Sequence, residues 1–173
     1  MAGGAATAVV ASGQERSTGR IVDDITLWTA IKKDLVLGHK DFKNTGVIVH
    51  EARVLLTGIV QNPKIRNEAS KIVWRHEGVK EVINEIQITD KDSIKNAVKD
   101  ISITGQVKGK LLLAKGIRYS NYKLTTVNNV VYLIGIAPNQ EELSQITDIA
   151  GRVAGVKKVV SYIRLRDSDL RSK

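Results

Sequence analysis

The sequence predicts an α+β protein made of tandem α-β-β-α-β domains, each with two helices packed on one face of a three-stranded sheet. Two observations lead to this fold class. Residues 54–88 and 131–165 align without a gap at an offset of 77, and about a third of the aligned positions are identical. Within each copy a helical period is followed by two short apolar runs, a second helical period and a last alternating run. The chain is therefore a tandem duplication.

The duplication extends upstream and sets the domain boundaries. The spacing Asp24-x-x-Leu27-x-x-x-Ile31 is repeated as Asp100-x-x-Ile103-x-x-x-Val107, at an offset of 76, so the second copy has gained one residue between helix and strand. The small residues at the start suit a tether, or simply a terminus without fixed structure. We expect an arm over 1–20, a first domain over 21–89, a polar linker over 90–99, a second domain over 100–166 and a tail over 167–173.

The first helix of each copy is expected to begin at an aspartate, Asp24 or Asp100, which suits the N-cap position. A hairpin comes next. In the second copy YKLTTV and VVYLIG flank Asn128-Asn129, a dipeptide that tolerates the positive φ of a tight turn. In the first copy GVIV and RVLLTG flank HEA at 50–52, a less standard turn.

The second helix of each copy has clear start and stop signals. Asn62-Pro63 combines a cap with the residue best suited to the first helical position, and Asn139 with Glu142 matches a capping box. Gly78 and Gly155 are expected to end these helices as left-handed C′ residues. The last strand then alternates, which predicts a buried face made of Val82, Ile86 and Ile88, or of Val159, Ile163 and Leu165.

Composition excludes several classes of function. There is no cysteine, which removes disulfides, thiolate catalysis and zinc–cysteine sites. The three histidines lie in different elements and are expected at the surface, and no catalytic or dinucleotide-binding motif is present. We therefore expect no enzyme activity, no metal and no cofactor. Trp28 and Trp74 fall within predicted helices and are expected in the core or between the domains.

The charge favours anionic partners, either phosphate backbones or acidic lipid headgroups. The formal net charge is +9, with +2 on residues 1–88 and +7 on residues 89–173. On a helical wheel for 101–115, one side carries Ile103, Val107, Leu111 and Ala114, which must face the sheet. The opposite side carries Ile101, Gly105, Lys108, Leu112 and Lys115. Apolar tips interleaved with lysines suit a helix in a membrane interface, although a merely solvated basic face is the alternative.

These motifs resemble the BON domain. The resemblance rests on the Asp-initiated helix, the V-x-L-x-G second strand and the helix–G-V-K-x-V ending, present twice in the right order. Two copies behind a small-residue arm resemble the dual-BON-domain outer-membrane lipoproteins of Gram-negative bacteria. Those proteins carry a lipid-modified cysteine at the mature N-terminus. Here Met1 precedes the arm, and we expect that it replaces the lipidated residue; if it is the natural start, the periplasmic assignment does not follow.

The resemblance implies a non-catalytic periplasmic protein at the inner leaflet of the outer membrane, binding anionic phospholipid such as phosphatidylglycerol or cardiolipin and supporting envelope integrity. The implied contact is the first helix of the second domain. A tryptophan that some members carry near its start is missing from DISIT at 100–104. The candidate lipid-binding residues are Ile101, Gly105, Lys108, Leu112, Lys115, Arg118 and Tyr119, with Tyr122 at the same level.

Two other functions remain open from the sequence. A scaffold that binds envelope proteins, such as outer-membrane assembly or division-site proteins, needs no lipid, and Ile101 and Leu112 would suit a protein groove equally well. A nucleic-acid-binding module would also explain the charge, but the strands lack aromatics placed for base stacking. We therefore expect no nucleic acid.

Overall fold

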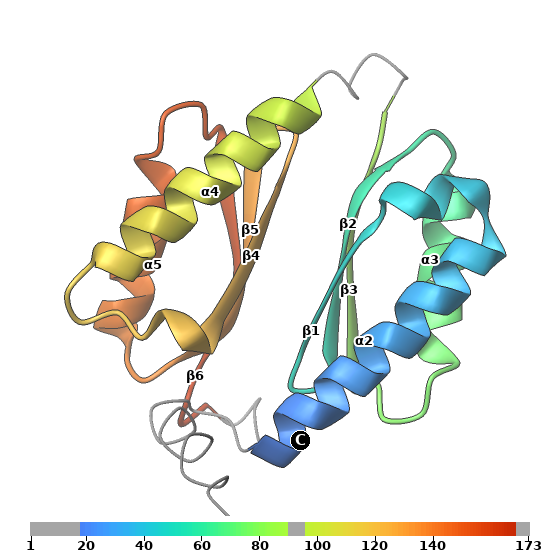
Figure 1. The fold of residues 1–173 in the computed structure, drawn as a ribbon, viewed down its shortest axis with the longest axis horizontal. Coiled ribbons are helices and arrows are strands. Elements are labelled where there is room, and N and C mark those ends of the chain that lie inside the picture. The colour runs from blue at the N-terminus through green and yellow to red at the C-terminus, as the bar shows by residue number, and fades with distance from the viewer. Residues whose placement is uncertain (1–17, 90–95, 169–173) are drawn as a thin grey trace, which may run out of the picture.

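The computed structural model describes residues 18–89 and 96–168, and the chain folds into two similar domains (Figure 1). The first consists of α2 (Thr18–Gly38), η1 (Lys40–Asn44), β1 (Gly46–His50), β2 (Arg53–Val60), α3 (Pro63–Trp74) and β3 (Glu81–Ile88). The second consists of α4 (Ala97–Leu113), η3 (Tyr119–Asn121), β4 (Tyr122–Val127), β5 (Val130–Ala137), α5 (Gln140–Gly151) and β6 (Lys158–Leu165). The predicted α+β class with tandem α-β-β-α-β units is confirmed. The predicted arm up to residue 17, the linker over 90–95 and the tail from 169 lie outside the described residues.

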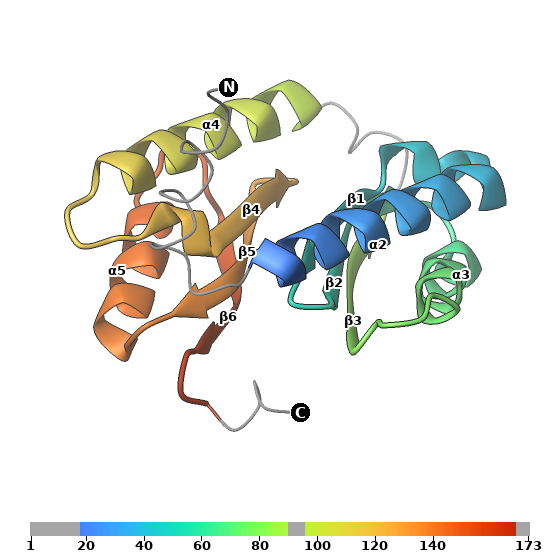
Figure 2. The same ribbon diagram turned by 60° about the horizontal axis from the view of Figure 1, so that its bottom comes forward.

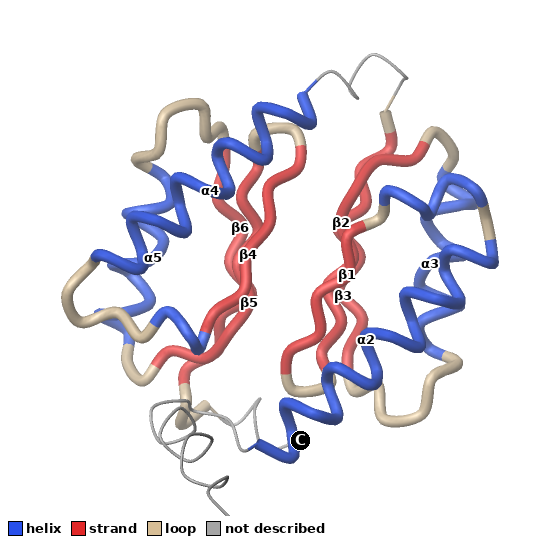
Figure 3. Tube along the Cα trace, in the orientation of Figure 1, coloured by secondary structure: helices blue, strands red, loops and turns tan. Residues whose placement is uncertain are grey.

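Each domain has a three-stranded sheet with both long helices on one face (Figures 1 and 3). The middle strand, β2 or β5, pairs antiparallel with the preceding strand and parallel with the following one. Helix-facing side chains form one apolar core per domain. Ile31, Leu35, Val54 and Leu56 belong to the first core, and Ile103, Val107, Leu111, Val131 and Leu133 belong to the second. The helical periods read from the sequence therefore identify the correct buried faces.

The two sheets pack on each other through the faces that carry no helices, as Figure 3 shows. Leu55 and Ile83 of the first domain are buried against Tyr132 and Ile134 of the second. Both faces of each sheet are thus covered, and β2 is buried along almost its whole length. Because of this second covered face, Ile83 is buried as well as Ile86, while Ile88 at the strand end is 44% exposed. The prediction that Ile88 is buried was wrong.

Asp24 and Asp100 do not cap helices. Helix α2 begins at Thr18, six residues before Asp24, and Asp100 lies within the first turn of α4. Both carboxylates are buried and bind the hairpin turn of their own domain. Asp24 accepts hydrogen bonds from the main-chain N–H groups of Glu51 (2.8 Å) and Ala52 (2.9 Å), and Asp100 does the same at Asn128-Asn129.

The two hairpin turns have the same geometry although their sequences differ. Both central residues have positive φ in each turn: 52° and 60° at Glu51-Ala52, and 51° and 66° at Asn128-Asn129. This is the two-residue turn whose twist matches that of the flanking strands. Asparagine adopts the left-handed conformation readily, whereas Glu51 and Ala52 do not. The carboxylate of Asp24 provides the compensating interaction.

The predicted start signals of the second helices are confirmed, whereas the predicted stop signals lie beyond the ends of the helices. The side chains of Asn62 and Asn139 accept hydrogen bonds from the main-chain N–H groups of Lys64 and Glu142, at 2.8 Å each. Gly78 and Gly155 have positive φ, but they lie in a turn four residues beyond the last helical residue rather than at C′. Glu142 is no capping-box partner, because its buried carboxylate accepts hydrogen bonds from Tyr122 and from the main chain of Arg118.

Several single side chains also lie where the sequence did not place them. Trp28 and Trp74 are exposed, so the prediction of core or interface positions was wrong. His50 is fully buried rather than at the surface, and His76 is largely buried with Nε2 3.4 Å from a carboxylate oxygen of Asp34. Periodicity alone could not locate them, because their burial depends on which neighbouring element covers the site.

Candidate functional site

Helix α4 presents an outward face that mixes bulky apolar side chains with lysines. Ile101 is 73% exposed and Leu112 is 63% exposed, and Gly105 and Lys108 are exposed on the same side, while Lys115 is exposed in the turn that follows the end of α4 at Leu113. These are the five residues that the helical wheel grouped together. Single exposed apolar side chains are common on protein surfaces, and the informative feature here is that several of them lie on one helix face together with a lysine. The structure therefore places these candidates together, on the outside of the second domain.

Contacts with the core and the sheet of its own domain fix the rotation of α4 about its axis. Ile103, Val107 and Leu111 are buried in the domain core, where they contact the sheet and α5. Asp100 binds the β4–β5 turn, and Thr104 Oγ1 lies 2.8 Å from Thr126 Oγ1. These contacts hold the helix on the sheet at both its N-terminal end and its middle. The opposite face is consequently held toward solvent, with Ile101 and Leu112 on it.

The exposed apolar face is larger than the sequence predicted. Val98 is 81% exposed and Leu113 is 87% exposed, and both extend the stripe at its two ends. Val98 was missed because the predicted helix began at Asp100, whereas α4 begins at Ala97. Its spacing of three residues before Ile101 is the signal that would have found it. Lys99 and Lys110 are also exposed on this helix, but they lie on its other flank, since Lys110 is about 180° around the helix from Ile101.

The residues after α4 divide into surface and core. Arg118 is exposed, and Tyr119 is half-buried against the domain core, where burial raises its pKa. Tyr122 is buried and donates its hydroxyl to Glu142 at 2.8 Å, so the expectation that it lies at the level of the other candidates was wrong. The Lys123 ammonium donates to the main-chain oxygen of Val49 across the domain boundary. The candidate face therefore ends at Arg118 and the exposed part of Tyr119.

The glycines of α4 leave the helix surface open. A Cβ at Gly105 or at Gly109 would have no atom within 4 Å. These glycines therefore do not serve close approach to the other domain.

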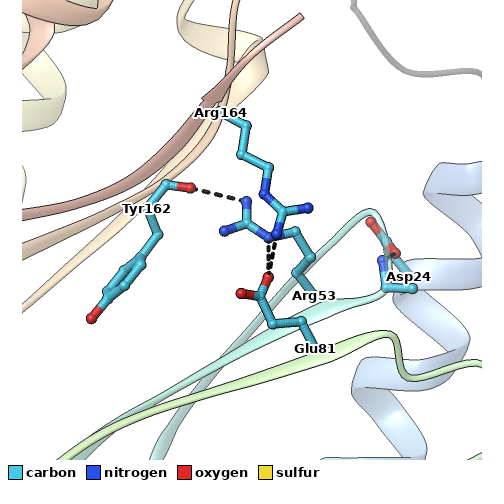
Figure 4. A network of polar contacts seen from close by, with 6 residues as sticks. Asp24, Arg53, Glu81, Tyr162 and Arg164 are labelled. Atoms are coloured by element: carbon cyan, nitrogen blue, oxygen red, sulfur yellow. Dashed lines mark hydrogen bonds and ion pairs between the residues drawn. The ribbon is translucent and has the colours of Figure 1, made fainter. Parts of the chain in front are cut away.

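A polar cluster between the domains is a second candidate, which sequence reasoning missed (Figure 4). Arg53 Nε and Arg164 Nη2 lie 2.6 and 3.0 Å from the same carboxylate oxygen of Glu81, and Arg53 also donates to the main-chain oxygen of Tyr162 at 2.9 Å. Burial lowers the pKa of Arg53, and the hydrogen bond to Glu81 opposes this shift. Two arginines from different domains thus share one carboxylate. No sequence signal connects these positions, because only docking brings them together.

This cluster joins the domains and does not form a charged binding site. An open hollow of about 1030 Å³ adjoins it. The hollow is lined by charges of both signs, among them Arg20, Lys80 and Arg164 with Asp23, Glu77 and Glu81. A mixture of this kind attracts neither anions nor cations preferentially. Among residues 18–89 and 96–168, no group of three histidine or acidic side chains is placed to hold a metal ion.

Fold and surface together describe a tandem-repeat protein with an exposed apolar and basic helix. No helix within the described part of the chain is long and apolar enough to span a membrane. A model of the BON domain family matches residues 23–90 and again residues 99–167. The chain belongs to the BON domain family and carries two copies of the domain.

Three relatives match over most of their length. A protein encoded in the gshII 5′ region of Anaplasma centrale is 43% identical over 152 residues, which is 87% of this chain and 99% of that one. Outer membrane lipoprotein DolP of Haemophilus influenzae is 32% identical over 169 residues, covering 95% of this chain and 86% of that one. The 21 kDa hemolysin of Actinobacillus pleuropneumoniae is 31% identical over 153 residues, covering 86% and 77%. The resemblance to dual-BON-domain lipoproteins is confirmed.

Proposed function

We propose that this protein binds anionic phospholipid at the surface of a membrane of the bacterial envelope, through the outward face of α4, and acts without catalysis. The observation that carries the proposal is the exposure of Ile101 and Leu112 beside Lys108 on one helix face, with Lys115 exposed in the turn that follows. Such a face is unnecessary for folding, since the opposite side of α4 supplies the whole contact with the core. It suits a headgroup region, where apolar tips reach the acyl boundary and ammonium groups meet phosphates.

The basic residues supply an attraction of useful size. Each basic side chain near an anionic surface contributes about 1 kcal/mol. Lys108, Lys115 and Arg118 would together contribute about 3 kcal/mol, or about 150-fold in affinity. Residues 101–123 contain no acidic side chain that would oppose this attraction. The apolar tips add a contribution that salt does not screen.

The family and the relatives support an envelope location. One relative bears the name of an outer membrane lipoprotein, and the match covers 95% of this chain. We propose a periplasmic location at the inner leaflet of the outer membrane, where binding of phosphatidylglycerol or cardiolipin would support envelope integrity. There, a tether in addition to α4 would turn a moderate affinity into stable localisation, because two attachments act cooperatively.

Co-sedimentation with vesicles tests the proposal. We expect binding to vesicles of phosphatidylglycerol or cardiolipin, weaker at physiological than at low salt, and little binding to phosphatidylcholine. The double variant Lys108→Glu/Lys115→Glu should weaken binding at least about thirtyfold, because two attractions of about 1 kcal/mol are lost.

A matched control separates this site from net charge. Lys64 and Lys71 on α3 are also exposed, also seven residues apart, and lie on the first domain. Lys64→Glu/Lys71→Glu changes the net charge equally and should leave binding within a fewfold of the parent protein. Equal losses in both double variants would show that only net charge matters. No vesicle binding by the parent protein would reject the proposal and favour a protein-binding scaffold.

A further inference from the structure

The outward face of α2 repeats the apolar pattern of α4. At the offset of 76 that relates the helices, Val22, Ile25, Val36 and Leu37 correspond to Val98, Ile101, Leu112 and Leu113. All eight side chains are between 40 and 87% exposed. Solvent-facing positions of a duplicated helix are free to become polar, and yet these four remain apolar in both copies. The first domain therefore carries an apolar face of the same shape as the proposed lipid-binding face.

Trp28 adds an aromatic side chain to the face of α2. It is 42% exposed, and its Nε1–H donates to the main-chain oxygen of Val47 at 2.9 Å. The polar edge of the indole is thereby satisfied within the protein, so the part of the ring that meets the surroundings is apolar. A tryptophan held in this way is suited to the headgroup region of a bilayer, where tryptophan is enriched.

The charges beside the two faces differ. Asp23 and Asp34 of α2 occupy the positions that Lys99 and Lys110 occupy in α4. Lys33 is exposed on α2, the Lys32 ammonium donates to the main-chain oxygen of Thr45, and the Asp34 carboxylate lies 3.4 Å from His76 Nε2. The surroundings of the α2 face are thus of mixed sign. Its contribution to binding would come from apolar contact, whereas that of α4 would come largely from charge.

The docking of the sheets puts α2 and α4 on opposite outer faces of the molecule but next to the same edge of the paired sheets, because α2 packs on β1, α4 packs on β4, and β1 contacts β4. Figure 1 shows the paired sheets edge-on, with α4 on the outer side of one sheet and α2 on the outer side of the other, both nearer the viewer than α5 and α3, and Figure 2 shows the same arrangement after rotation. The buried contact between the sheets and the ion pair of Arg164 with Glu81 hold the domains together. A bilayer that lies along this edge can contact both helices.

We propose that α2 is a second contact with the same lipid bilayer, which inserts Val22, Ile25 and Trp28 into the headgroup region while α4 holds the anionic headgroups. This inference rests on the proposed function of α4. It divides the interaction between the two copies: the second domain recognises charge, and the first supplies apolar contact that is insensitive to salt.

Tryptophan fluorescence tests this directly, because the chain contains only two tryptophans and both lie in the first domain. In Trp74→Phe, Trp28 is the only tryptophan; in Trp28→Phe, only Trp74 on α3 remains. With phosphatidylglycerol vesicles containing brominated lipid, we expect strong quenching and a blue shift for Trp28. Trp74 should show little of either, although it is 54% exposed in the absence of lipid.

A pair of variants measures the contribution of α2. Val22→Gln/Ile25→Gln places a good helix former at two exposed positions, so the helix is retained. The double variant should lower vesicle affinity about tenfold, since two aliphatic contacts are lost. The dependence of the remaining affinity on salt should be unchanged, whereas Lys108→Glu/Lys115→Glu should reduce that dependence.

The outcomes separate the two proposals. If the parent protein sediments with anionic vesicles while Trp28 is not quenched and Val22→Gln/Ile25→Gln binds like the parent, α2 does not contact lipid, and the function proposed for α4 stands. If the parent protein does not sediment with vesicles at all, both proposals fail together.

Discussion

Replacing Asp24 should destabilise the first domain more than its position on a helix suggests. The carboxylate is buried and accepts two main-chain hydrogen bonds, at 2.8 and 2.9 Å, from the two residues of the β1–β2 turn. Those residues, Glu51 and Ala52, have φ of 52° and 60°, a conformation that non-glycine residues adopt at a cost. A hydrogen bond to a charged group contributes about 1.5–3 kcal/mol. Asp24→Ala should therefore lower the free energy of unfolding by about 3 kcal/mol.

Urea unfolding followed by tryptophan fluorescence measures this loss, because both tryptophans report on the first domain. Asp23→Ala is the matched control: Asp23 is the exposed neighbour in the same helix, and its loss should change stability by no more than about 0.5 kcal/mol. Asp24→Asn keeps one acceptor and should lie between the two. If Asp24→Ala were no less stable than Asp23→Ala, the carboxylate would not be what holds the turn.

Two further predictions concern the domain boundary and the glycines. Burial and the hydrogen bond to Glu85 raise the pKa of Tyr162 well above its usual range. In the unfolded chain the phenol ionises near pH 10. The stability that the buried, neutral phenol contributes is therefore complete below that pH and is lost as the pH rises further. Tyr162→Phe should show a smaller fall in urea midpoint between pH 8 and pH 11 than the parent protein does. Gly109→Ala should raise the unfolding free energy by up to about 1 kcal/mol, because alanine favours the helix and a Cβ there has no atom within 4 Å. Gly135→Ala should lower it by about 2 kcal/mol, since its Cβ would overlap the main-chain oxygen of Asn121. Thermal unfolding that ranks the two glycine variants the other way would contradict this reasoning.

Local pattern predicted much of the candidate site. The period of 3.6 residues identified Ile103, Val107 and Leu111 as the buried face of α4, and it thereby placed Ile101 and Leu112 outward. It succeeded because one strand layer beneath a helix buries one stripe of it. The same reasoning failed at Tyr122, whose ring enters the core and whose hydroxyl meets Glu142, a partner twenty residues away in the sequence.

The sequence by itself determined the elements that depend on neighbours along the chain. The duplication, the asparagine caps and the helical stripes are local signals, because their partners lie within a few residues. Tertiary structure alone decided what depends on distant partners. The role of Asp24 is set by a turn 27 residues away, and the burial of Ile83 and the pairing of Glu81 with Arg164 are set by the other domain. The placement of α2 and α4 next to the same edge of the paired sheets follows from how the two sheets dock, because the direction in which each helix faces depends on that packing.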